Sequence, residues 1–98
     1  MANLIITYWR DIPSQVSVKI GRKEEKRMLS ERFQEAIDMA AMRDGASDTD
    51  AYLAEWRRAA PVTVSDDLAA EAETARNGIE TAYDKERLKA LIAKGGRE

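Results

Sequence analysis

The first twenty residues carry the pattern of two β-strands, and this pattern most constrains the fold. Residues 4–10 are mostly β-branched or aromatic and contain neither glycine nor proline, which favours a strand. Residues 15–20 alternate polar and apolar side chains, the period of a strand with one buried face. Residues 11–14, which include Pro13, are typical of a turn. Because an isolated hairpin is only marginally stable in water, the rest of the chain must pack against it.

The chain after Gly21 changes to the helical period. A first helix is predicted to begin within residues 22–25 and to end at residues 43–45, where Gly45 can adopt the left-handed C-terminal position. Its apolar residues recur on one helical face. They are Met28, Leu29, Phe33, Ala36, Ile37, Ala40 and Ala41.

Three further helices are predicted from N-cap residues followed by apolar residues spaced three and four apart. The second runs from the cap candidates at 47–50 to about Ala59. The third runs from 65–67 to Ala82, with a break at Asn77–Gly78 left open because glycine weakens a helix interior. The last begins at Asp84 and ends at residues 95–96.

Residues 62–64, Val-Thr-Val, are a candidate third strand between two of these helices. The predicted order is therefore β-β-α-α-β-α-α. This order indicates an α+β fold, with a small two- or three-stranded, largely antiparallel sheet that begins with the N-terminal hairpin and is packed by three to four helices. The 98 residues suit a single domain, with an ordered core over about residues 3–93 and a loose segment at 95–98.

The chain contains neither histidine nor cysteine. The absence of both excludes disulfides, thiolate metal sites, thiol nucleophiles and any histidine-centred triad. The first residues lack the basic region and long apolar stretch of a signal peptide, and no apolar run is long enough to span a bilayer, so we expect a cytoplasmic protein. The net charge of −2 indicates no general affinity for nucleic acid. We expect no catalytic residue, cofactor site or metal site.

The aromatic and charged residues at the end of the first predicted strand are the first candidate for a binding surface. They are Tyr8, Trp9, Arg10 and Asp11. Neighbours in a strand point to opposite faces, so either ring is a candidate to face away from the helices, where it suits a protein partner or base stacking. The competing interpretation is that both rings are covered, because so small a sheet needs its large apolar side chains.

A second candidate is the basic cluster at residues 22–27, where two glutamates interrupt four cations. On a helix, like charges four residues apart repel one another, and cations at a helix start oppose its dipole, which hints at an anion or acidic partner. The alternative is a solvated charged surface, which the small energetic contribution of surface charges favours. The candidate anion-binding residues are Arg22, Lys23, Lys26 and Arg27.

Trp56 and Arg57 are the third candidate, a contact patch one helical turn beyond Tyr52. In the alternative interpretation Trp56 anchors a short helix to the core and the arginines bind its last carbonyls. Paired carboxylates, such as Asp48 with Asp50, are explained by helix capping and the helix dipole.

Three stretches resemble the small bacterial "virulence factor" domain family. They are residues 8–16 with the Tyr-Trp-Arg-Asp-Ile-Pro run, residues 29–38 and residues 50–56, and the likeness extends over about residues 4–91. In longer proteins a similar domain is joined to an iron–sulphur scaffold-like domain and to helical repeats. The resemblance therefore implies accessory or assembly work in the bacterial cytoplasm, and it carries over no catalytic residue.

Together these observations predict a non-enzymatic accessory or protein-interaction module whose partner is another protein. The first alternative is a nucleic-acid or anion-binding domain that uses the basic cluster. The second is a non-catalytic subunit of a multi-protein enzyme. A membrane partner is not expected, and the sequence leaves the oligomeric state open.

Overall fold

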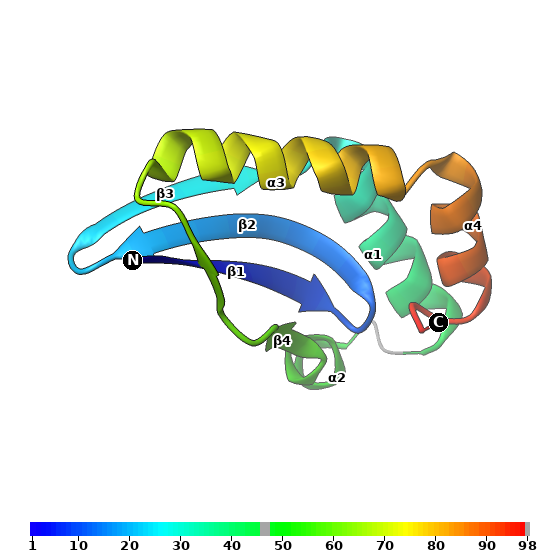
Figure 1. The fold of residues 1–98 in the computed structure, drawn as a ribbon. Coiled ribbons are helices and arrows are strands. Elements are labelled where there is room, and N and C mark those ends of the chain that lie inside the picture. Colours follow the sequence, from blue (N-terminus) through cyan, green and yellow to red (C-terminus); the bar gives the residue numbers. More distant parts are fainter. Residues whose placement is uncertain (46–47, 98) are drawn as a thin grey trace.

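A computed structural model describes residues 1–45 and 48–97 of the chain, which form one antiparallel sheet and four helices (Figure 1). In chain order the elements are β1 (Ala2–Trp9), β2 (Ile12–Ile20), β3 (Lys23–Met28), α1 (Glu31–Arg43), α2 (Thr49–Ala54), β4 (Trp56–Arg58), β5 (Val62–Val64), α3 (Leu68–Ala82) and α4 (Lys85–Ala93).

The sheet has the strand order β3-β2-β1-β4, and β5 also pairs with β1. In the β1–β2 hairpin Leu4 lies opposite Val18 and Ile5 opposite Ser17. The pairing register shifts between Thr7 and Tyr8, shortly before the turn, which marks a β-bulge or similar irregularity in the ladder. β4 and β5 pair with opposite ends of β1, so these two short strands share one edge of the sheet.

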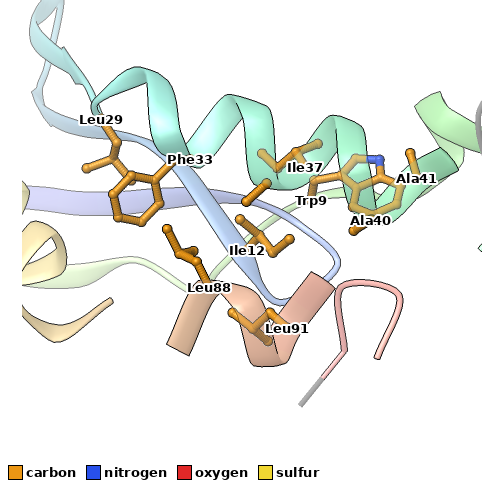
Figure 2. Close-up of a cluster of buried hydrophobic side chains, with 10 residues drawn as sticks. Trp9, Ile12, Leu29, Phe33, Ile37, Ala40, Ala41, Leu88 and Leu91 are labelled. Atoms are coloured by element: carbon orange, nitrogen blue, oxygen red, sulfur yellow. The ribbon is translucent and has the colours of Figure 1, made fainter. Parts of the chain in front are cut away.

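Two groups of helices cover the sheet. α3 runs along β2 and β3 (Figure 1). Val18 of β2 packs with Ala72 of α3. α1 and α4 lie together at the end of the sheet that carries the β1–β2 turn (Figure 1). Trp9 and Ile12 flank that turn and enter the larger core between these two helices, beside Phe33, Ile37 and Leu91 (Figure 2). None of the helices in the described ranges has the length and apolar character that a membrane span requires.

The predicted α+β class, the N-terminal hairpin and the strand at residues 62–64 are confirmed. Asp48 and Asp84 cap their helices as expected, each through a side-chain oxygen that accepts a backbone N–H bond. Ser47, another predicted cap candidate, lies outside the described residues. α3 continues through Asn77 and Gly78, so the break left open there is absent.

The prediction that a helix begins within residues 22–25 is wrong, because residues 23–28 form β3 and α1 starts at Glu31. In a strand, side chains two apart share a face. Glu25 and Arg27 form an ion pair on one face of β3, and Glu24 and Lys26 form one on the other. In a strand these cations therefore lie beside carboxylates, whereas in a helix they would lie four residues from another cation.

The second helix is shorter than predicted. α2 ends at Ala54, and residues 56–58 become β4 because their backbone pairs with the end of β1. The prediction that residues 95–98 form a loose segment is also partly wrong. Gly95 and Gly96 are buried, and the Gly96 carbonyl accepts a hydrogen bond from the Asp11 amide at 2.8 Å. Arg97 is exposed, and Glu98 lies outside the described residues.

Candidate functional site

Trp9 is fully buried, so the expectation that it contributes to an exposed contact patch is wrong. Its side chain points toward α1 near Ala40 and Ala41 (Figure 2). The indole N–H donates a 2.9 Å hydrogen bond to the Tyr52 carbonyl, and the two rings lie 5.8 Å apart. The competing interpretation, in which the ring is covered, therefore holds for Trp9.

Arg10 is buried as well, and it joins parts of the chain that are distant in sequence. It adopts the left-handed backbone conformation, with φ of 54°. Its guanidinium forms an ion pair with Asp44 at the end of α1, donates to the Gly95 carbonyl at 2.7 Å and lies over the Trp9 ring at 4.8 Å. Its Nε is buried without a hydrogen-bond partner among the described residues. This network gives Arg10 a structural role rather than a surface contact.

Tyr8, Asp11 and Arg57 do come together beside the turn; Tyr8 and Asp11 are partly buried and Arg57 is exposed. The Arg57 side chain lies 4.6 Å above the Tyr8 ring and forms a 3.1 Å ion pair with Asp11. Its Nε also donates to the Arg10 carbonyl at 2.9 Å. Trp56 packs edge-on against Tyr52, 5.8 Å between ring centres, and borders the main core. Trp56 borders the core, as the anchoring interpretation expected, but it lies in β4 rather than on a helix. Arg57 binds the Arg10 carbonyl and Asp11, not the last carbonyls of α2.

The predicted anion cluster is divided by the strand geometry of β3. Lys26 and Arg27 point to opposite faces of the sheet. Arg27 binds Glu25 and, at 2.7 Å, Glu73 of α3, and these hydrogen bonds raise the pKa of Arg27. Arg22 and Lys23 are exposed at the β2–β3 turn. The four cations therefore do not converge on one ligand.

The paired carboxylates serve helix ends. Asp67 accepts the Ala70 N–H bond at the start of α3, and Asp48 does the same for Ala51 in α2. Over residues 1–45 and 48–97, no three acidic side chains gather in the way a metal ion requires.

An apolar surface on α1 is the feature that the sequence prediction missed. Met39 and Met42 are 51% and 65% exposed, respectively, and stand three residues apart, so they are neighbours on the helix surface. A shallow hollow lies beside each of them. One, between α1 and α4, is lined by Ala36, Met39, Leu88 and Ile92 with charged residues around them; the other, toward α2, is lined by Asp38, Ala41, Met42 and Tyr52. We call the two methionines with these hollows the methionine ridge.

The ridge combines adaptable apolar side chains with a charged rim of both signs. Methionine is flexible and polarizable, which suits it to surfaces that accept another protein. Around the α1–α4 hollow lie Glu35, Lys85 and Lys89, all exposed. A signal for the ridge was present in the sequence, because Met39 and Met42 fall beside the buried stripe of α1 rather than within it. Such positions are usually polar on a helix that has water on its outer face.

A family model described as "Virulence factor" matches residues 7–92 of the chain. Searches of curated proteins and of solved structures give no match. The matched region includes the buried turn at Trp9 and Arg10 as well as the methionine ridge.

Proposed function

The chain belongs to the Virulence factor family, and from this premise we propose that it is a non-enzymatic protein-interaction module that binds its partner through the methionine ridge. The partner is another protein of the bacterial cytoplasm, and the module serves it in an accessory role. The inventory of side chains supports this proposal, since histidine and cysteine, which supply most general bases and thiol nucleophiles, are absent from the sequence.

The exposure of two neighbouring methionines between two apolar hollows is the observation that carries the proposal. Single exposed apolar residues are common, whereas a contiguous apolar surface with a polar rim marks an interaction site. Met39 borders the hollow toward α4 and Met42 borders the hollow toward α2, so the apolar surface extends across α1.

The shape and charges of this surface fit the apolar side of an amphipathic helix from the partner. Such a helix places side chains three and four residues apart into a groove between two helices, which is the form of the α1–α4 hollow. Glu35 on α1 and Lys89 on α4 stand on the rim of that hollow, where each can pair with an opposite charge on the partner.

Affinity purification from a bacterial lysate, followed by mass spectrometry, tests the proposal with matched variants. Met39→Glu and Met42→Glu place a charge on the ridge, whereas Met28→Glu makes the same change at a side chain that is 60% exposed on β3. A protein that binds the ridge should be retained by the wild type and by Met28→Glu. Its affinity for either ridge variant should fall by about thirtyfold or more, the effect of losing a hot-spot residue.

Thermal unfolding should be similar for all three variants, because none of the replaced side chains is buried. If every variant retains the same proteins, the ridge is not the binding surface. If purified wild-type protein instead self-associates and the ridge variants are monomeric, the occupant is a second copy and the proposed heterologous partner is wrong.

A further inference from the structure

The sheet face opposite α3 carries a polar hollow that shares no residue with the methionine ridge. Strand alternation directs Val16 and Val18 toward the helices and Gln15, Ser17 and Lys19 to the other side. Pairing then places Ile5 and Lys26 on either side of Ser17. The hollow has a volume of about 220 Å³ and is lined by Ile5, Thr7, Gln15, Ser17, Lys19, Glu24, Lys26 and Arg58.

Positive charge is concentrated in this hollow although the whole chain has a net charge of −2. Three cations, Lys19, Lys26 and Arg58, surround a single carboxylate, that of Glu24. Lys26 lies 3.8 Å from Glu24, while Lys19 and Arg58 form no ion pair with any described residue. Two positive charges are therefore left uncompensated on the uncovered side of the sheet.

The Glu24 carboxylate is the anion that lies among these three cations. The Ser17 hydroxyl donates a 2.7 Å hydrogen bond to its carboxylate. This hydrogen bond is the main cause that lowers the pKa of Glu24, and the charges of Lys26, Lys19 and Arg58 lower it further against the opposing effect of partial burial. The local potential thus favours negative charge at the centre of the hollow.

We propose that this hollow binds a small polyanion, whose phosphate or carboxylate groups lie between Lys19, Lys26 and Arg58, with Glu24 as an internal competitor. A planar guanidinium and two ammonium groups suit oxyanions, and the side chains of Thr7 and Gln15 supply neutral hydrogen-bond donors beside them. The described residues that line it include no aromatic side chain, and single-stranded nucleic acid commonly stacks its bases on such rings. The ligand is therefore a small molecule of the size of the hollow.

Titration of the full chain with pyrophosphate and, separately, with citrate at low ionic strength tests the site. Binding is followed by backbone amide shifts in NMR spectra and by calorimetry. We expect saturable shifts confined to β1, β2, β3 and β4, which weaken as salt is added. Saturation by pyrophosphate alone indicates a phosphate ligand, by citrate alone a carboxylate ligand, and by both the shared oxyanion chemistry; each result supports the site.

The variants distinguish a built site from general attraction. Arg58→Gln and Lys19→Gln should each weaken binding about tenfold, because each removes a charge-assisted hydrogen bond. Lys23→Gln removes the same charge from the same sheet on the side that faces α3, and it should leave affinity unchanged. Glu24→Gln should tighten binding severalfold, since it removes the competing carboxylate and leaves a hydrogen-bonding amide.

Circular dichroism checks that each variant is folded. The proposal is overturned if neither anion gives saturable shifts at millimolar concentration, if Lys23→Gln weakens binding as much as Arg58→Gln does, or if folded Glu24→Gln binds more weakly than the wild type.

Discussion

Arg10 occupies the left-handed backbone region, which costs a residue with a side chain about 1 kcal/mol or more. The cost is offset because this geometry directs its guanidinium to Asp44 and the Gly95 carbonyl, and its backbone N–H to the Glu55 carbonyl at 3.1 Å. Glycine would fit the backbone but lose the guanidinium contacts. The most distinctive residues of the sequence, Trp9 and Arg10, therefore fix the fold.

Gly96 provides a prediction at the residue scale. A Cβ at this position would lie 3.0 Å from the Trp9 ring, and its φ of 90° disfavours any side chain. Gly96→Ala should therefore lower the free energy of unfolding by about 2–4 kcal/mol, from backbone strain and crowding together. Urea denaturation measures the loss.

Gly45→Ala is the matched control, because Gly45 also has positive φ, at 71°, but a Cβ there meets no atom of the described residues within 4 Å. It should cost only the strain component, about 1 kcal/mol. Equal losses for the two variants would show that the contact with Trp9 does not constrain position 96.

At the element scale, α3 supplies the N-terminal partner of α1. Ser30 precedes α1 but does not cap it with its own hydroxyl. The Glu80 carboxylate of α3 instead accepts the Ser30 N–H at 2.6 Å and the Ser30 hydroxyl at 2.9 Å, and it pairs with Arg32 at 3.0 Å. Burial alone would raise the pKa of Glu80, but the bonds from Ser30 and Arg32 together lower it.

This lowered pKa predicts how stability depends on pH. The unfolded chain binds a proton at Glu80 more readily than the folded chain does, so the contribution of Glu80 is complete above its unfolded pKa and is lost as pH falls through the folded one. Glu80→Gln should lower the free energy of unfolding by about 1–3 kcal/mol at neutral pH. The difference from wild type should shrink below about pH 4. Denaturation curves across pH 3–7 measure it, and a pH-independent difference would contradict the assignment.

Local sequence patterns predicted the elements that have one apolar, buried face. The secondary structure of the other elements depends on pairing with residues that are distant in sequence. The alternation in β2 and the apolar stripe of α1 were sufficient because each has one buried face. β3 has a single apolar residue, Met28, so its state depends on pairing with β2 and on the Arg27–Glu73 ion pair with α3. Sequence periodicity contains neither of these interactions.

For the molecule as a whole, the same limit applies to the candidate sites. Lys19, Lys26 and Arg58 belong to three different strands and meet only through sheet register. The sequence analysis expected β3 and β4 to be helical. It therefore could not predict that these three cations lie close together. Met39 and Met42, by contrast, lie on a helix that was predicted. The methionine ridge could therefore have been predicted from the apolar residues beside the buried stripe of that helix.

The chain segment after α4 provides a prediction at this scale. A chain that ends at Lys94 loses the Gly95 and Gly96 carbonyls, which leaves the buried Arg10 and the Asp11 amide without these acceptors. The free energy of unfolding of this shortened chain should be about 3 kcal/mol lower than that of the wild type. Removal of residues 97–98 alone deletes the exposed Arg97–Glu55 pair and should cost under about 1 kcal/mol. Calorimetric melting compares the two chains, and similar stabilities would contradict this role for residues 95–96.

The bond between Arg10 and Gly95 joins residues 85 positions apart, and this separation bears on synthesis. A ribosome that adds about 5–20 residues per second makes Gly95 about 4–17 s after Arg10. Asp44 and Glu55 are made earlier, but throughout that interval Arg10 lacks the Gly95 carbonyl and Trp9 lacks Gly96, which finally contacts its ring. The turn of the first hairpin therefore gains its last hydrogen-bond acceptors only when the end of the chain has been made.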